Sequence, residues 1–157
     1  MVFLEWLEFS ALAEWVSASL WGYPITLTSH GVGLAIVVGI IFMLNLRLLG
    51  KFSGLPYQTL LSYMKLAWAG FLLNFISGCM LFTAQATFFV TSTPYLIKIF
   101  AITAGAVVAV LLQQKVRAGA SDWDSGIAVP DKVKNMATLS IVLWSITIIA
   151  GRMTAYL

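Results

Sequence analysis

The chain has 157 residues, of which 61% are hydrophobic and 10% are charged, and its mean hydropathy is +0.95. A soluble domain carries roughly 25% charged residues, so this composition excludes a water-soluble globule and predicts an integral membrane protein. Nine Lys/Arg against six Asp/Glu give a formal net charge of +3, with no basic cluster dense enough to indicate nucleic-acid binding.

The first apolar segment, residues 2–21, contains three glutamates, Glu5, Glu8 and Glu14, together with three tryptophans. Each glutamate at the centre of a bilayer would cost about 2.5–3.5 kcal/mol. We therefore predict that residues 1–22 form a helix lying in the membrane interface. On one regular helix Glu5 and Glu8 project opposite to Glu14, so we expect a partner subunit to cover one of these faces. The glutamates also stand where a signal peptide would be basic, so we expect no cleavable leader.

Residues 23–157 contain four further apolar segments, each about 20 residues long, which is enough to cross a hydrocarbon core of about 30 Å. Pro24 and Pro94 stand where proline is tolerated, in a first helical turn. The predicted architecture is all-α, a four-transmembrane-helix bundle with an N-terminal interfacial helix. The predicted spans are about 24–46, 60–84, 94–114 and 134–156.

Loop charge predicts the orientation of the spans. The connection over residues 85–93 and the N-terminal segment contain no basic residue. The positive-inside rule places the two basic connections in the cytoplasm and both termini on the outer side, which in a bacterium is the periplasmic side. The basic residues in or beside these two connections are Arg47, Lys51, Lys65, Lys115, Arg117, Lys132 and Lys134.

His30 is the only histidine, and it lies inside the first predicted span. At 1.5 Å per residue it lies roughly 9 Å below the outer edge, and Lys98 lies roughly 6 Å below it. Arg152 and Gln85 fall near the same level of their spans, so four helices each bring a polar group to one outer layer. Ionisable side chains within hydrocarbon usually face a protein interior, a cavity or a cofactor. The alternatives are that Lys98 and Arg152 snorkel to headgroups and that His30 is a hydrogen-bonded contact between helices.

Small residues surround the histidine. Gly31, Ala35 and Gly39 form a stripe that we interpret as ordinary close helix packing. Gly33 lies one turn from His30 on nearly the same face, where it would leave room beside the imidazole for the edge of a macrocycle.

These residues predict a cofactor site made by His30, Gly33, Lys98 and Arg152. A neutral imidazole is a good axial ligand for haem iron, so His30 is the predicted metal ligand of a haem b. Lys98 and Arg152 would pair with the propionates. A quinone is an alternative occupant. The sixth position would be empty or filled by Met80, Met153, water or His30 of a symmetry-related subunit.

Cys79 is the single cysteine, so no internal disulfide forms, and we interpret it as a small buried hydrophobic residue. Copper bound by His30 with Met80 or Met153 is chemically reasonable, but the spacing gives it no specific support.

Four motifs together resemble a family of small bacterial four-helix membrane proteins of unknown function. The resemblance implies a bacterial inner-membrane protein with His30, Arg47, Lys98 and Arg152 at matching positions. In layout the chain is also loosely similar to copper-resistance D-type and cytochrome b-like membrane proteins, which usually show more than one intramembrane histidine. The motifs are YPITLTSH-x-x-G-x-A-x-x-x-G (Tyr23–Gly39), LRLLG (Leu46–Gly50), Pro-x-x-x-Lys (Pro94–Lys98) and G-R-x-x-A-Y (Gly151–Tyr156).

The favoured functional hypothesis is a haem b protein that transfers electrons near the periplasmic face, to or from a periplasmic redox partner. The alternatives are a non-redox accessory subunit of a membrane complex and an oligomeric transporter of anions or small molecules. We expect a homo-oligomer, because the small-residue faces favour close helix contacts. A stand-alone enzyme is not indicated, since Asp122, Asp124 and Asp131 lie on the predicted cytoplasmic side, away from His30.

Overall fold

The computed structural model describes residues 2–156, and every secondary-structure element in that range is helical. Four of the helices are long and apolar enough to cross a membrane. The structure thus confirms an all-α, four-span bundle. The helices are α1 (Val2–Glu8), α2 (Ala11–Ala18), α3 (Gly22–Leu48), α4 (Tyr57–Thr83), α5 (Ala86–Thr91), α6 (Thr93–Asp124) and α7 (Asp131–Met153).

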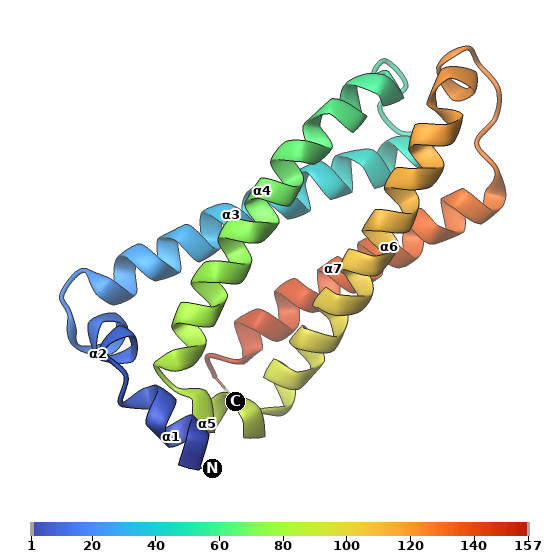
Figure 1. The fold of residues 1–157 in the computed structure, drawn as a ribbon. Coiled ribbons are helices and arrows are strands. Elements are labelled where there is room, and N and C mark those ends of the chain that lie inside the picture. Colours follow the sequence, from blue (N-terminus) through green and yellow to red (C-terminus); the bar gives the residue numbers. More distant parts are fainter. Residues whose placement is uncertain (1, 157) are drawn as a thin grey trace.

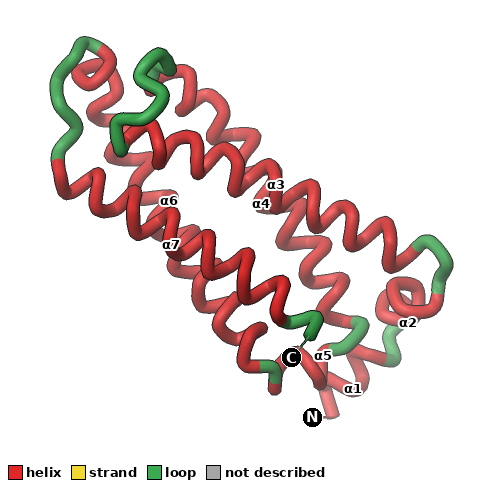
Figure 2. Tube along the Cα trace, turned by 180° about the vertical axis from the view of Figure 1, so that it is seen from behind, coloured by secondary structure: helices red, strands yellow, loops and turns green. Residues whose placement is uncertain are grey.

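The four long helices form two antiparallel hairpins, α3–α4 and α6–α7, which pack side by side (Figure 1). Contacts within each hairpin are more extensive than contacts between α4 and α6 or between α3 and α7. The α3–α4 and α6–α7 connections lie at one end, which we call the basic end. Helices α1, α2 and α5 lie at the opposite, terminal end, with Val2 and Tyr156 (Figures 1 and 2).

Each of the four prolines lies at the start of a long helix. Pro24 is the third residue of α3, and Pro94 is in the first turn of α6. Pro56 and Pro130 are the N-cap residues of α4 and α7, each with an extended backbone. Proline suits these positions because the first amides of a helix have no intrahelical acceptor to lose.

Glycine ends two of the long helices. Gly50 after α3 has φ 86° and Gly126 after α6 has φ 103°, a left-handed conformation that costs glycine little. Helix α6 ends at Asp124, two residues before Gly126, and so extends well beyond the predicted end at residue 114. Buried Val116 and Ala120 continue its packed face past that point.

The N-terminal segment is broken into two helices, where we predicted one. Ser10 is the N-cap of α2, and its hydroxyl accepts a hydrogen bond from the Ala13 amide at 3.2 Å. The break removes the conflict between the glutamates, because Glu8 and Glu14 now belong to helices with different axes. Glu8 Oε1 accepts hydrogen bonds of 2.8 Å from both the amide and the hydroxyl of Thr87, so α5 of the same chain partners this glutamate.

The apolar core fills the basic half and the middle of the bundle. One cluster of buried residues includes Leu48, Met64 and Leu112 and joins all four long helices. A second cluster includes Val37 and Trp144 and joins α3, α6 and α7. Together they hold the two hairpins against each other.

Hydrogen bonds close the basic end. The Asp124 carboxylate accepts bonds from the amides of Tyr57, at 2.8 Å, and Gln58, at 3.3 Å, and so caps the N-terminus of α4. The Tyr57 hydroxyl donates to the Arg47 carbonyl at 3.1 Å, and the Arg47 guanidinium lies 4.3 Å from the Tyr57 ring centroid. Arg47 Nε also donates to the carbonyl of Leu55 at 2.7 Å. Both loops are thereby tied to helix ends.

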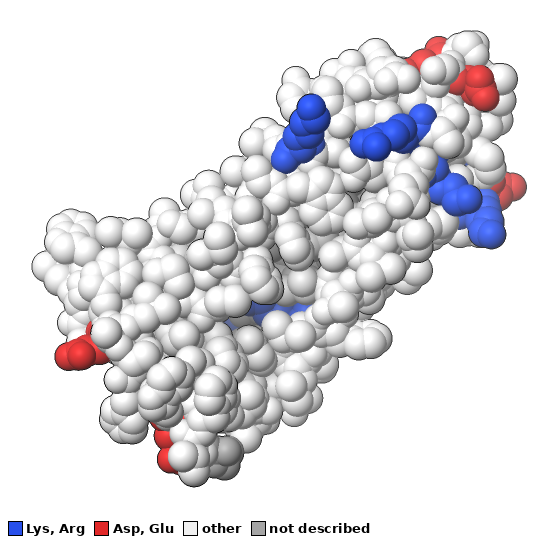
Figure 3. Space-filling view, viewed as in Figure 1, with Lys and Arg blue, Asp and Glu red and all other residues white. Residues whose placement is uncertain are grey.

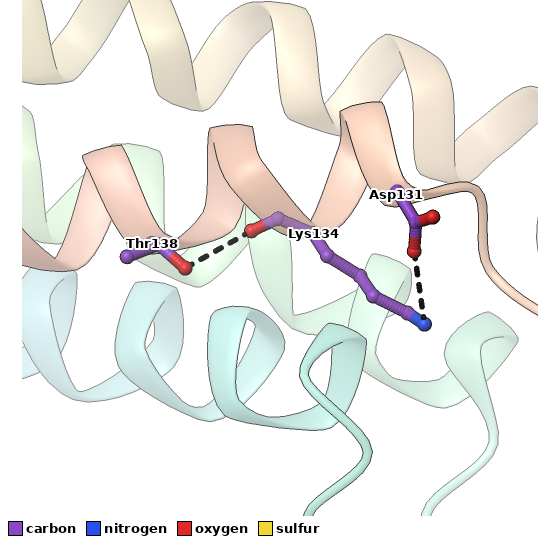
Figure 4. A network of polar contacts seen from close by, with 3 residues as sticks. All are labelled: Asp131, Lys134 and Thr138. Carbon is purple, nitrogen blue, oxygen red and sulfur yellow. Dashed lines mark hydrogen bonds and ion pairs between the residues drawn. The ribbon is translucent and has the colours of Figure 1, made fainter.

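Ion pairing contributes little to this fold. Within residues 2–156 a single salt bridge is present, Lys134 Nζ to Asp131 Oδ1 at 3.5 Å, in the first turns of α7 (Figure 4). Exposed pairs of this kind are worth about 0–1 kcal/mol. The basic residues gather on one half of the molecule, where Figure 3 shows most of the blue surface.

The carboxylate cap at the basic end predicts a stability effect. We expect Asp124→Asn to lower the free energy of unfolding by about 1 kcal/mol, because the charge at the N-terminus of α4 is lost. The measurement is the thermal unfolding midpoint in detergent, with Asp122→Asn as the matched control. Equal midpoints for the two variants would show that the cap does not stabilise the bundle.

Candidate functional site

The main chains of α3 and α4 cross in close contact at Gly33 and Gly70. A Cβ atom on Gly33 would lie 2.7 Å from both the Gly70 carbonyl oxygen and the Asn74 amide nitrogen. The space beside Gly33 is filled by the α4 backbone, which corrects the expectation that a macrocycle edge fits there. A Cβ added to Gly31 or Gly39 would have no neighbour within 4 Å, and both lie with Ala35 on an exposed face. Within this chain, the helix-packing role therefore belongs to Gly33, and the predicted stripe contacts no other helix at its glycines.

His30 is bound to α4 one turn from this crossing. Its Nδ1 lies 3.0 Å from the Asn74 carbonyl oxygen, and the Asn74 side-chain amide donates to the His30 carbonyl at 2.8 Å. A carbonyl only accepts, so Nδ1 carries the hydrogen and the lone pair of a neutral ring is on Nε2. Ser77 Oγ, 3.2 Å from Nδ1, lies on the same side of the ring. The imidazole is therefore fixed in one tautomer and one orientation.

Gly78 gives the imidazole its place against α4. A Cβ at this position would lie 3.1 Å from His30 Cε1 and 3.4 Å from Nδ1. The first of these distances is shorter than an ordinary van der Waals contact, so a larger residue would displace the ring. The sequence shows Gly70, Asn74 and Gly78 at four-residue intervals on one face of a helix. This spacing is the feature of the sequence that indicates that this face of α4 packs closely against another helix.

A cavity of about 710 Å³ opens beside His30 at the terminal end. Its size lies within the range of roughly 300–1,000 Å³ that is typical of small-molecule sites. Three aromatic rings on its wall, Phe82, Phe89 and Tyr95, are nearly parallel, with centroids 5.1–6.2 Å apart. The remaining lining residues come from α2 to α7 and the chain after α7: Ser17, Tyr23, Leu27, His30, Gly78, Leu81, Ala84, Gln85, Phe88, Lys98, Gly151, Thr154, Ala155 and Tyr156.

Lys98 reaches this cavity from the first turns of α6. Its aliphatic stem lies against Gly151 of α7, where a Cβ would be 3.4 Å from Cδ and Cε. Figure 3 shows a hollow in this face of the molecule with basic atoms at its floor. His30, Gln85 and Lys98 therefore share one cavity, as their depths in the spans predict.

Arg152 lies beside the cavity and not on its wall. It is exposed, and its Nη2 donates to the hydroxyl of Tyr156 at 2.9 Å. Tyr156 itself lines the cavity. One nitrogen of the Arg152 guanidinium is thus engaged by a residue of the cavity wall.

Neither predicted methionine ligand lines the cavity. Met80 is half-buried elsewhere on α4, and Met153 is exposed. Cys79 is also exposed, so the interpretation of this residue as a buried hydrophobic group is wrong. Among the residues that the structure describes, no group of three or more His, Cys, Asp or Glu could hold a metal ion. A metal at this site would therefore be held by His30 together with ligands from a bound cofactor.

The chain matches no protein-family model, no curated protein and no solved structure. The resemblance to small bacterial four-helix membrane proteins therefore stays a prediction, and the site is interpreted from its own geometry.

The α3–α4 crossing predicts opposite effects for two glycines two residues apart. We expect Gly33→Ala to destabilise the protein by about 1–3 kcal/mol, because its Cβ would meet main-chain atoms that cannot move without separating the helices. Gly31→Ala should leave stability unchanged or raise it slightly, since its Cβ would meet nothing. Thermal unfolding midpoints of both variants in one detergent provide the comparison. A destabilised Gly31→Ala beside an unaffected Gly33→Ala would contradict the observed crossing.

Proposed function

We propose that this membrane protein binds a haem b through His30 and transfers electrons at the terminal end of the bundle. One observation carries the proposal: the Nδ1 side of the imidazole is held by the Asn74 carbonyl, and the ring lies on the wall of a large cavity. Histidines that ligate metals usually donate their other ring N–H to a carbonyl or carboxylate in this way. The unprotonated Nε2 is then the atom available to iron.

The surrounding residues suit a flat, mainly apolar group with an anionic edge. The parallel rings of Phe82, Phe89 and Tyr95 offer a face for stacking. Lys98 supplies a cation on the wall, and Arg152 supplies a second one at the mouth once it leaves Tyr156. A bound haem would contribute one-electron chemistry, and these residues would hold and orient it.

The proposal includes a place in the cell and an assembly. The two basic connections favour an orientation with the basic end in the cytoplasm. In a bacterial inner membrane the terminal end would then face the periplasm, where a redox partner would meet the cavity. Among the described residues, no second histidine and no methionine or cysteine lines the cavity. A homo-oligomer in which His30 of a second copy reaches the site would supply a second imidazole.

A quinone is the second candidate occupant. Here the supporting observation is that Lys98 and His30 line the same cavity as three aromatic rings. Lys98 can donate to a quinone carbonyl, and His30 Nε2 can accept from a hydroxyl of the reduced quinol. A quinone needs no second metal ligand.

The haem proposal predicts a spectrum that depends on His30. We expect the purified protein, supplied with haem, to show a reduced α-band that is lost in His30→Ala and kept in Gly31→Ala. In His30→Gly, added imidazole should restore the band, because a free imidazole can occupy the vacated space and ligate iron. Oxidised and dithionite-reduced absorbance spectra provide the measurement.

The result that overturns the haem proposal is a colourless wild type under full haem loading, or a band that His30→Ala leaves intact. Organic extraction of the same colourless preparation then tests for a quinone. A protein that holds neither group would favour an accessory subunit.

A further inference from the structure

The charged side chain on the cavity wall is basic, and no acidic side chain accompanies it. Lys98 contributes an ammonium group, and no aspartate or glutamate is among the lining residues. The acidic residue in the neighbouring surface pocket is Glu8, which borders Ala84 and Gln85. Its Oε1 already accepts two hydrogen bonds from Thr87, so this carboxylate is engaged in joining α1 to α5.

Lys98 has no partner for its charge within residues 2–156. The one salt bridge in that range joins Lys134 and Asp131 at the basic end, so no carboxylate of these residues pairs with Lys98. The side chain is half-buried, and its stem is seated along Gly151. A cation removed from water in an apolar setting is costly unless an anion or a strong acceptor pairs with it.

Several other polar groups of the cavity can donate as well. Tyr95 and Tyr156 carry hydroxyls, Gln85 carries an amide, and Arg152 donates to the Tyr156 hydroxyl, whereas His30 Nε2 is an acceptor. The rest of the wall is mainly apolar, with leucines and phenylalanines from α3, α4 and α5. The cavity therefore combines a positive, donor-rich region with an apolar interior.

We propose that the cavity binds a lipophilic carboxylate, with Lys98 paired to the carboxylate and the apolar body lying against α3 and α4. This inference goes beyond the haem proposal, because it concerns the charge of the ligand and holds for a cavity that contains no iron. The carboxylate can belong to a fatty acid or to a haem propionate, and the experiment below separates these two sources.

The probe is palmitate that carries a photoreactive diazirine, applied to the haem-free protein in phosphatidylcholine nanodiscs. We expect saturable labelling that maps to peptides of α3, α4 or α6, and at least about tenfold weaker labelling with the methyl ester of the same probe. Lys98→Gln should raise the probe concentration for half-maximal labelling by at least about tenfold, because one partner of a partly buried charge pair is lost. Lys98→Arg, which keeps the charge, should retain most of the binding.

Lys65→Gln is the matched control, since Lys65 is an exposed lysine of another long helix toward the basic end. It should leave labelling unchanged, and unfolding midpoints will show that all variants are folded. Competition by haemin would identify the haem propionate as a source of the carboxylate, and competition by palmitate alone would identify a fatty-acid ligand. Either result supports the inference.

Equal labelling by the acid and the ester, or full labelling of folded Lys98→Gln, would overturn the proposal and leave Lys98 as a cation that snorkels to headgroups. The outcome is independent of the haem test. A protein without an α-band can still select the carboxylate, and a haem that binds through His30 can do so without any contribution from Lys98.

Discussion

The contact on which the candidate site depends is the crossing of α3 and α4 at Gly33 and Gly70. Two glycines allow main chains to approach closely enough for hydrogen bonds to run between the helices in both directions. The Asn74 amide donates to the His30 carbonyl, and the His30 ring donates to the Asn74 carbonyl. In a membrane, where helices gain nothing by hiding apolar surface from lipid, such close packing and polar contacts are what hold helices together.

The two ends of the bundle differ because different forces close them. At the basic end, buried apolar side chains fill the space between the hairpins, and Asp124, Tyr57 and Arg47 tie the loops to the helices. At the terminal end, α5 contacts both hairpins, through α4 and α6, while α1 and α2 pack mainly against the first hairpin and α5. The space between the hairpins is a cavity lined by aromatic and polar groups. This difference places the candidate ligand site at one end only of the part of the chain that the structure describes.

His30 and Lys98 illustrate two ways of keeping a polar side chain within an apolar bundle. The His30 ring is satisfied on one side by α4, and the residue lies on the wall of the cavity. The aliphatic stem of Lys98 lies against Gly151, and no salt bridge within residues 2–156 involves its charge. A satisfied group has a structural reason to be present, whereas an unsatisfied one suggests a ligand. The two residues thus support separate inferences about the same cavity.

Hydropathy and distance along a helix were enough to predict the number of spans and the common depth of His30, Lys98 and Gln85. They also predicted that two of the spans begin close to a proline. These features depend on local sequence, so they need no knowledge of neighbours. Which glycine packs was settled only by the assembled bundle: Gly33 meets α4, while Gly31 faces outward, although both lie close to His30 in the chain.

The same holds for the turn of Arg152 toward Tyr156, the exposure of Cys79 and the break of the N-terminal helix at Ser10. For the residues on long helices, the rotation of each helix about its axis sets these contacts. These helices are apolar on nearly all sides, so the sequence does not show which face of each helix points inward. Only the packed bundle does.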